Sequence, residues 1–252
     1  MKKFSACVIF LLLSVLLMPT TAFAASETTV DKIEYTAELR TDGTARISEL
    51  WTVTTGDTPE SFGRKIALPD DEFESFAEVG ELAVSVDGVI CSEAADGFTG
   101  DDTYTLTKTQ DGYFIDWNLS SKNTTHTFAL RYIKTGAVKL YDGNAYFYTT
   151  VVNEDDSYGI CHDITISILT QQRCFSENFT VVESGSLAGK KSDSSIVFSA
   201  DNAAGLVKVA VSMPSETFDT QYLINLNPEK RSAYLQIRTS VYTGGKPLEE
   251  SG

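Results

Sequence analysis

The chain has 252 residues, and its 20 lysine and arginine residues against 35 aspartate and glutamate residues give a formal net charge of −15. This charge disfavours sequence-independent nucleic-acid binding, in which basic side chains displace counterions from phosphates, so we expect no nucleic-acid partner. A hydrophobic content of 42% argues against wholesale disorder, because disordered chains combine high net charge with low hydrophobicity. The length permits one large all-β or α/β domain, or two smaller ones.

The first 24 residues have the three regions of a secretory signal peptide in order. Lys2 and Lys3 precede an apolar stretch from Phe4 to Leu17, and Ala22-Phe23-Ala24 fits the small-x-small cleavage pattern. We therefore predict that residues 1–24 are removed and that the mature protein is secreted or extracytoplasmic. Peripheral association of the mature protein with the cell envelope is an open alternative. Cleavage would leave 228 residues with a net charge of −17, since Lys2 and Lys3 leave with the signal. No second apolar stretch of about 18 residues follows, so we expect no membrane span in the mature chain.

Three cysteines, Cys91, Cys161 and Cys174, remain after this cleavage. An odd number allows at most one intramolecular bridge in a compartment that permits disulfides. Cys161 and Cys174 are closest in sequence and form the candidate disulfide. Three buried, reduced thiols are the alternative.

Short runs of alternating apolar residues, separated by turn residues, are typical of an antiparallel β protein. Four of the five Asp-Gly pairs, which begin at Asp42, Asp87, Asp111 and Asp142, lie between alternating runs and suit hairpin turns because glycine tolerates a positive φ. In chain order, the expected strands cover residues 33–39, 45–51, 104–106, 113–119, 127–133, 145–152, 164–169, 179–182, 196–198, 206–213, 222–226 and 233–241. The polar stretch 183–195 is expected to be the longest loop.

The register of the first hairpin isolates one acidic residue. A three-residue loop with Gly43 in a left-handed bulge sets residues 33, 35, 37 and 39 opposite residues 51, 49, 47 and 45. Glu49 then lies on the apolar face, opposite Tyr35. Because a buried carboxylate without a partner is costly, we predict a structural ion pair between Glu49 and Arg64. Deleting Glu49 should then cost a few kcal/mol, about the cost of breaking a buried pair.

Between the next two expected strands, a two-residue loop formed by Asp111 and Gly112 would give a coherent apolar face. That face would carry Tyr104, Leu106, Tyr113, Ile115, Trp117 and Leu119. About a dozen short strands favour an antiparallel β-sandwich, immunoglobulin-like or related, over residues 25–214. Residues 215–252 are expected to form a small carboxy-terminal β segment and a mobile tail.

Acidic residues offer two further kinds of chemistry. Asn153, Glu154, Asp155 and Asp156 follow an apolar strand and could supply oxygen ligands to calcium, although their spacing is not that of an EF-hand loop. Glycoside hydrolysis needs two carboxylates about 5 to 10 Å apart, for which Glu49 and Asp155 are the candidates. The solvated-loop interpretation of the acidic cluster and the structural interpretation of Glu49 are favoured, so we expect no cofactor.

Three groups of residues carry a resemblance to a known family. They are Asp42–Glu49, Gly63–Ile66, and Leu130-Arg131-Tyr132 through Gly136-Ala137 to Ala145–Tyr148. Together they resemble the amino-terminal domain of domain-of-unknown-function family 2207, described as predicted membrane proteins, over about Val30 to Pro214. The resemblance implies an extracytoplasmic, β-rich domain of a bacterial-type envelope protein with no established activity, and it also isolates Glu49 and Arg64. Family members usually continue into a transmembrane segment, whereas this chain stops at Gly252, so a secreted variant or a shortened chain is expected.

The leading functional hypothesis is a secreted or envelope-associated, non-catalytic binding module. Its partner is unknown from the sequence, and an envelope protein and a glycan both remain open. The first alternative is a carbohydrate-active hydrolase that uses Glu49 with an acidic loop residue such as Asp155. The second is a calcium-stabilised extracellular domain.

Overall fold

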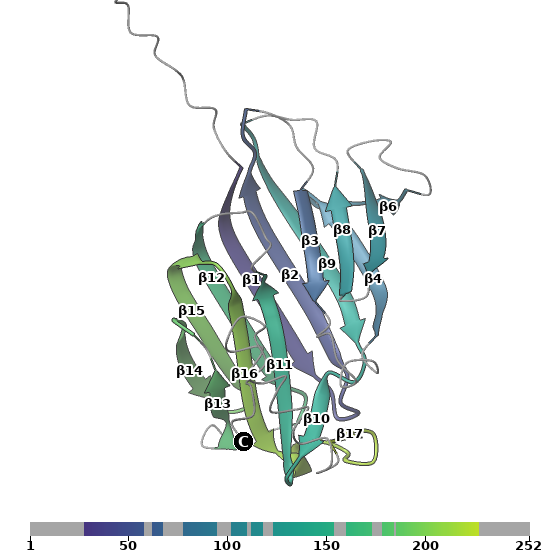
Figure 1. Cartoon of the computed structure of the whole chain (residues 1–252), viewed down its shortest axis with the longest axis vertical. Helices are drawn as coiled ribbons and strands as arrows, with labels where there is room; N and C mark the ends of the chain where they lie inside the picture. Colours follow the sequence, from purple (N-terminus) through teal and green to yellow (C-terminus); the bar gives the residue numbers. More distant parts are fainter. Residues whose placement is uncertain are drawn as a thin grey trace, which may run out of the picture.

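The computed structural model describes residues 28–57, 62–67, 78–94, 102–109, 112–117, 123–153, 160–172, 178–183 and 185–226. These residues form an all-β fold, which confirms the predicted fold class, with three sheets packed as a sandwich (Figure 1). The predicted signal peptide, the expected strand at 233–241 and the carboxy-terminal tail lie outside the described residues. Within the described part of the chain, no helix is both long enough and apolar enough to cross a membrane.

The largest sheet has eight strands and is called the large sheet below. In spatial order it contains β14 (Ala188–Ser192), β15 (Ser195–Ala204), β12 (Ile160–Thr170), β1 (Thr29–Leu39), β2 (Ala45–Thr54), β9 (Thr125–Lys134), β4 (Val79–Val86) and β5 (Val89–Ile90). One face of this sheet packs against the two smaller sheets, which lie in front of it in Figure 1.

The two smaller sheets divide the remaining strands between them. The five-stranded sheet contains β13 (Thr180–Glu183), β16 (Val207–Pro214), β11 (Asn144–Val152), β10 (Val138–Tyr141) and β17 (Ile224–Asn225). The four-stranded sheet contains β3 (Phe62–Ala67), β8 (Gly112–Trp117), β7 (Thr103–Thr109) and β6 (Ser92–Glu93). A short 3₁₀ helix, η2 (Ser215–Thr217), follows β16.

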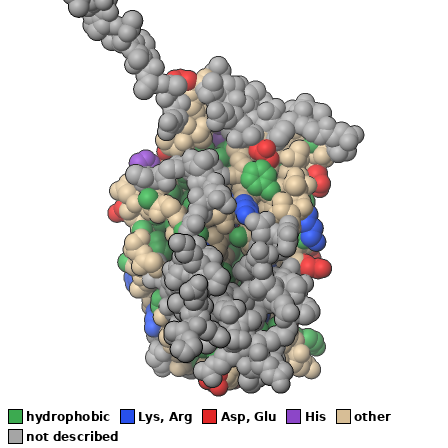
Figure 2. Space-filling model, in the orientation of Figure 1, with side chains coloured by type: hydrophobic (Ala, Val, Ile, Leu, Met, Phe, Trp, Pro, Cys, Tyr) green, Lys and Arg blue, Asp and Glu red, His purple; other side chains and the backbone are tan. Residues whose placement is uncertain are grey.

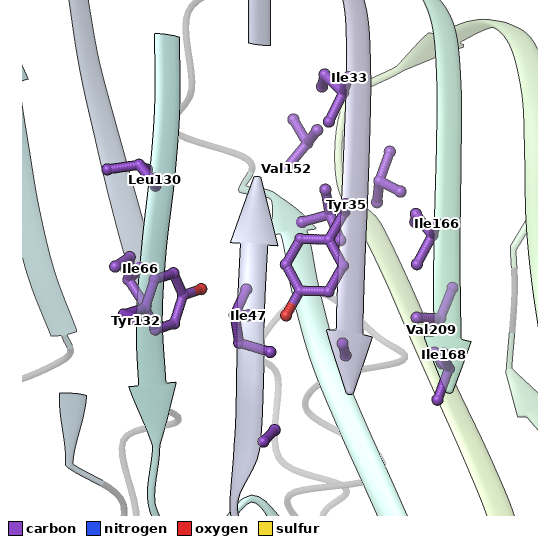
Figure 3. Packing of buried hydrophobic residues seen from close by; sticks show 14 of the residues in the cluster. Ile33, Tyr35, Ile47, Ile66, Leu130, Tyr132, Val152, Ile166, Ile168 and Val209 are labelled. Atoms are coloured by element: carbon purple, nitrogen blue, oxygen red, sulfur yellow. The ribbon is translucent and has the colours of Figure 1, made fainter. Parts of the chain in front are cut away.

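The core lies between the large sheet and the smaller sheets. Alternate residues of the central strands are buried, as the period-two pattern predicts. Figure 3 shows part of this core, where Ile166 and Ile168 of the large sheet lie beside Val209 of the five-stranded sheet. The outward residues of the same strands are mostly polar, which is typical of a sheet with one solvated face.

The predicted register of the first hairpin is confirmed. Tyr35 pairs with Glu49 and Glu38 pairs with Arg46. Gly43 has a φ of +77°, and a Cβ there would come within 2.6 Å of Leu223. A left-handed conformation and close packing therefore both favour glycine at this position.

The hairpin that contains Gly112 has the predicted face at Tyr104, Leu106, Tyr113, Ile115 and Trp117, whereas Leu119 lies outside the described residues. Its register differs from the prediction, because Leu106 pairs with Ile115 and Thr109 with Gly112. Gly112 belongs to β8 instead of the turn, and its Cβ would lie only 2.2 Å from the Ile66 carbonyl oxygen. The Asp-Gly pair thus reflects a close strand approach here, a second reason for glycine that turn rules do not include.

Three pairings differ from the purely antiparallel prediction. β1 pairs in parallel with β12 at the centre of the large sheet, β10 with β17, and β6 with β7. The predicted loop at 183–195 also contains a strand, β14, whose residues are all exposed and therefore show no apolar alternation. In the carboxy-terminal segment, β17 joins the five-stranded sheet, and Phe218 and Leu223 belong to the core.

Candidate functional site

Glu49 and Arg64 form the predicted ion pair inside the sandwich. Glu49 is on β2 with a fully buried side chain, and Arg64 on β3 is 1% exposed. Arg64 Nε lies 2.7 Å from Glu49 Oε2, and Arg64 Nη2 lies 3.2 Å from Glu49 Oε1. This two-point contact joins the four-stranded sheet to the large sheet.

Two neutral donors complete the surroundings of the Glu49 carboxylate. Trp51 Nε1 donates to Oε2 at 2.9 Å, and the Tyr132 hydroxyl donates to Oε1 at 2.8 Å. The Arg64 guanidinium carbon also lies 5.0 Å from the centre of the Trp51 ring, a cation–π contact. Each carboxylate oxygen thus accepts two hydrogen bonds, and a buried charge is compensated by a cation and by neutral donors.

Further hydrogen bonds extend this group of side chains to the five-stranded sheet. The Lys65 carbonyl of β3 accepts from Arg64 Nη1 and, at 3.1 Å, from Asn153 Nδ2 just after β11. The Tyr35 hydroxyl of β1 lies 2.8 Å from Thr149 Oγ1 of β11. We call the side chains of Tyr35, Glu49, Trp51, Arg64, Tyr132, Thr149 and Asn153 the Glu49 cluster. It lies where the three sheets meet.

The two tyrosines of the Glu49 cluster have raised pKa values. Burial, followed by the negative charge of Glu49, raises the pKa of Tyr35 and of Tyr132 above the usual value for tyrosine. A tyrosine hydroxyl is protonated at physiological pH even at its usual pKa of about 10, and the raised values extend this to more alkaline solution. Tyr132 can therefore donate to Glu49. Figure 3 shows the two hydroxyls directed toward the strand that carries Ile47, from β1 on one side and β9 on the other.

The geometry is unsuited to the hydrolase chemistry considered for Glu49. A catalytic carboxylate must reach the scissile bond of a substrate. Glu49 is fully buried, and both of its oxygens are already occupied by donors. Its proposed catalytic partner, Asp155, lies outside the described residues. The structural interpretation of Glu49 is therefore the one that the geometry supports.

The two tryptophans serve in packing. Trp51 is 1% exposed and Trp117 is fully buried, so both rings lie inside the core. Phe62 and Phe128 stack with ring centres 4.5 Å apart, and the Trp117 ring lies 5.2 Å from that of Phe128. These contacts connect β3 and β8 to β9 beside the Glu49 cluster.

The candidate calcium ligands are only partly described. Asn153 uses its side-chain nitrogen for the Lys65 carbonyl, and residues 154–156 lie outside the described residues. Among the residues that the structure describes, no group of three histidine, cysteine or acidic side chains could hold a metal ion. The expectation of no cofactor thus stays a prediction, with calcium binding by Asn153, Glu154, Asp155 and Asp156 as its untested alternative.

Two cysteines are described, and both are buried, free thiols. Cys161 Sγ lies 3.2 Å from the Asp163 carbonyl oxygen, and burial raises the pKa of the Cys161 thiol to about 11. Burial also raises the pKa of Cys91. The expected partner of Cys161, Cys174, lies outside the described residues, so the free Cys161 thiol lends no support to the predicted disulfide.

Sequence reasoning found the ion pair but missed the neutral members of the Glu49 cluster. Tyr132 occupies an inward position of the predicted strand at 127–133, so the alternation of apolar and polar residues predicts that it is buried. Its place beside Glu49 depends on the pairing of β2 with β9, in which Glu49 opposes Leu130. That long-range register leaves no signal in a single sequence.

Comparison with protein-family models and with curated proteins finds no match, and the resemblance to family 2207 stays a prediction. Among solved structures, yeast LTA4 hydrolase in complex with bestatin is 11% identical, with 81% of this chain and 32% of that chain covered and a TM-score of 0.47. An M1 zinc metallopeptidase from Deinococcus radiodurans is 10% identical, with 75% and 42% covered and a TM-score of 0.41. This chain thus spans less than half of either protein, and likenesses this distant indicate nothing about activity.

Proposed function

We propose that this protein is a secreted or envelope-associated, non-catalytic binding module. The observation that carries the proposal is the state of Glu49, the acidic residue that stands out most in the sequence. Its carboxylate accepts four hydrogen bonds inside the core. The residue that most suggested catalysis is therefore engaged in joining sheets.

The described surface is the second consideration. The charged side chains of the described residues visible in Figure 2 lie singly or in small groups, mostly toward the margins of the view. Exposed large apolar side chains are few among the described residues, and they are Val89, Ile90, Phe114 and Tyr222. A rigid β scaffold with outward-facing strands and loops suits recognition of a partner. The signal-like segment at residues 1–24 supports an extracytoplasmic site of action.

The test combines binding and turnover assays on residues 25–252. We expect saturable binding to an envelope component or a glycan on an array, and no turnover of chromogenic glycosides. Glu49→Gln removes the charge and keeps the shape, and it is assayed below its own melting temperature, because Arg64 then lacks its counter-charge. Turnover by the wild-type protein that this variant loses, together with no bound ligand in the array and in pull-down from envelope fractions, would overturn the proposal.

A further inference from the structure

Strand β14 forms an open edge of the large sheet. All five of its residues are exposed. It pairs with β15 over its full length without a bulge, from Ala188 opposite Ser199 to Ser192 opposite Ser195. Figure 1 shows β14 at the left margin of the large sheet. The sheet therefore ends there in a regular strand whose outer side faces solvent.

The outward backbone groups of this edge belong to Gly189 and Lys191. Ser192 and Ser195 flank a two-residue turn, and the residues next to such a turn form a hydrogen-bonded pair. By alternation, Ala188, Lys190 and Ser192 direct their N–H and C=O groups toward β15. Gly189 and Lys191 then direct theirs to the open side. The two outward N–H groups and the two outward C=O groups thus have the spacing with which one further strand could form hydrogen bonds.

The opposite edge of the large sheet is closed by its own geometry. Glu81 of β4 has a φ of +53°, and the pairing of β4 with β9 shifts between Gly80 and Ala83. The edge strand β5 has two residues, after which the chain crosses into the four-stranded sheet at β6. Bulges and very short strands are two of the devices that protect sheet edges from pairing, and lysines on the edge are another. β14 has no bulge and is longer than β5, but it carries Lys190 and Lys191.

The charge of the β14 edge is opposite to that of the whole protein. Lys190 and Lys191 are both exposed in a chain with a net charge of −15. Lys191 Nζ donates to the Phe179 carbonyl, whereas no ion pair involves Lys190 within the described part of the chain. Pairing two β14 strands from two copies would bring lysines together, which is unfavourable. An acidic strand is the complementary partner.

We propose that the β14 edge, residues Ala188–Ser192, binds an extended acidic segment of a partner protein, which adds to the large sheet as a further strand. This inference rests on the proposed function and assigns it a surface and a partner chemistry. Backbone hydrogen bonds to Gly189 and Lys191 supply the affinity, and carboxylates near Lys190 supply the selectivity.

The test uses the fluorescence anisotropy of labelled, end-blocked heptapeptides with residues 25–252 of the protein. The probe alternates glutamate and valine. One control peptide has lysine in place of glutamate, and the other has proline at the central valine. We expect saturable binding of the acidic peptide and affinities lower by about tenfold or more for both controls, because one reverses the charge and the other removes a ladder donor.

Three variants locate the site. Lys190→Glu should weaken the acidic peptide by about tenfold or more, since it puts like charges together. Lys32→Glu makes the same charge change on β1, three strands inward, and should leave the affinity unchanged. Lys191→Pro removes an outward N–H but none of the inferred bonds to β15, and should abolish binding. Should this variant fail to fold, hydrogen exchange of Gly189 and Lys191 in the wild-type protein replaces it, and both amides should slow when the acidic peptide binds.

Several results would overturn the inference. They are equal affinities for the acidic and lysine peptides, an equal loss in Lys32→Glu and Lys190→Glu, unchanged exchange at Gly189 and Lys191, or no binding at all. If no peptide binds and Lys190→Thr dimerises, the lysines only guard the edge against pairing. Each of these failures is distinct from failure of the proposed function, because the envelope and glycan assays report a ligand on any surface of the protein.

Discussion

Replacing Glu49 with leucine would remove the acceptor around which the Glu49 cluster is organised. The buried Arg64 guanidinium would keep its bond to the Lys65 carbonyl and lose both bonds to the carboxylate. Trp51 Nε1 and the Tyr132 hydroxyl would each lose an acceptor as well. Leucine is chosen over alanine because it fills most of the vacated volume and so limits the cavity contribution.

The expected loss of unfolding free energy follows from these contacts. Removing one member of a buried pair costs about 3–5 kcal/mol, because an uncompensated charge stays in the core. Each neutral donor left without an acceptor adds about 1–3 kcal/mol in isolation, but these penalties overlap when the site relaxes. We therefore expect about 3–5 kcal/mol in total, which at about 2–4 °C per kcal/mol lowers the melting temperature by about 6–20 °C.

Urea unfolding followed by far-ultraviolet circular dichroism measures this loss. Tryptophan fluorescence is a poor probe, because Trp51 belongs to the perturbed site. The matched control is Glu38→Leu, which breaks the ion pair of Glu38 on β1 with Arg46 on β2, the strand that also carries Glu49. These two side chains are 40% and 56% exposed, so the control should cost less than about 1 kcal/mol.

The double variant Glu49→Leu/Arg64→Met tests the physical reason for the loss. With both charges gone, an apolar pair replaces the ion pair, and stability should recover by at least about 2 kcal/mol relative to Glu49→Leu. A Glu49→Leu loss below about 0.5 kcal/mol, or a double variant no more stable than the single one, would refute the reasoning that an uncompensated Arg64 charge causes the loss.

Three other predictions concern protonation, thiols and calcium. Burial raises the pKa of Tyr35 and Tyr132, so their contribution to stability is complete below the unfolded pKa of about 10 and is lost as pH rises through the folded values. The unfolding free energy should fall above about pH 10, less steeply in Tyr35→Phe than in the wild type, with the exposed Tyr222→Phe as an unchanged control. Because the pKa of Cys161 is about 11, a thiol reagent at about pH 8 should label this residue in a Cys174→Ser variant only after denaturation, and rapid native labelling would contradict its burial. Millimolar calcium should leave the melting temperature unchanged, whereas a rise lost on Asp155→Asn would establish the calcium site at 153–156.

Much of the local structure was predictable from neighbouring residues. The first hairpin shows this best, because turn chemistry at Gly43 and apolar alternation on both arms allow one register only. That register placed Glu49 on the buried face. Because a buried carboxylate needs a compensating charge, it predicted a cation beside Glu49, and Arg64 is that cation. The hairpin at Gly112 shows the limit of such rules. There, glycine is favoured by the approach of β3, which lies about 45 residues earlier in the chain.

Other features of the Glu49 cluster depend on contacts between distant strands. Tyr132 reaches Glu49 because β9 lies beside β2, and Thr149 reaches Tyr35 because β11 crosses over β1 in another sheet. No turn residue or alternation pattern specifies which strands become neighbours. That choice depends on the summed burial of many side chains.

The sequence by itself determined the all-β class, the inward and outward faces of the strands and the unusual position of Glu49, because these follow from the backbone period and from turn residues close in the chain. Only the tertiary structure decided the parallel pairing of β1 with β12, the division into three sheets and the full set of donors to Glu49. It also decided that β14 is an open edge, since an exposed edge strand has no buried face and leaves no apolar pattern in the sequence. Local physics thus sets the pattern of each strand, and competition among all the strands for partners sets the sheet order.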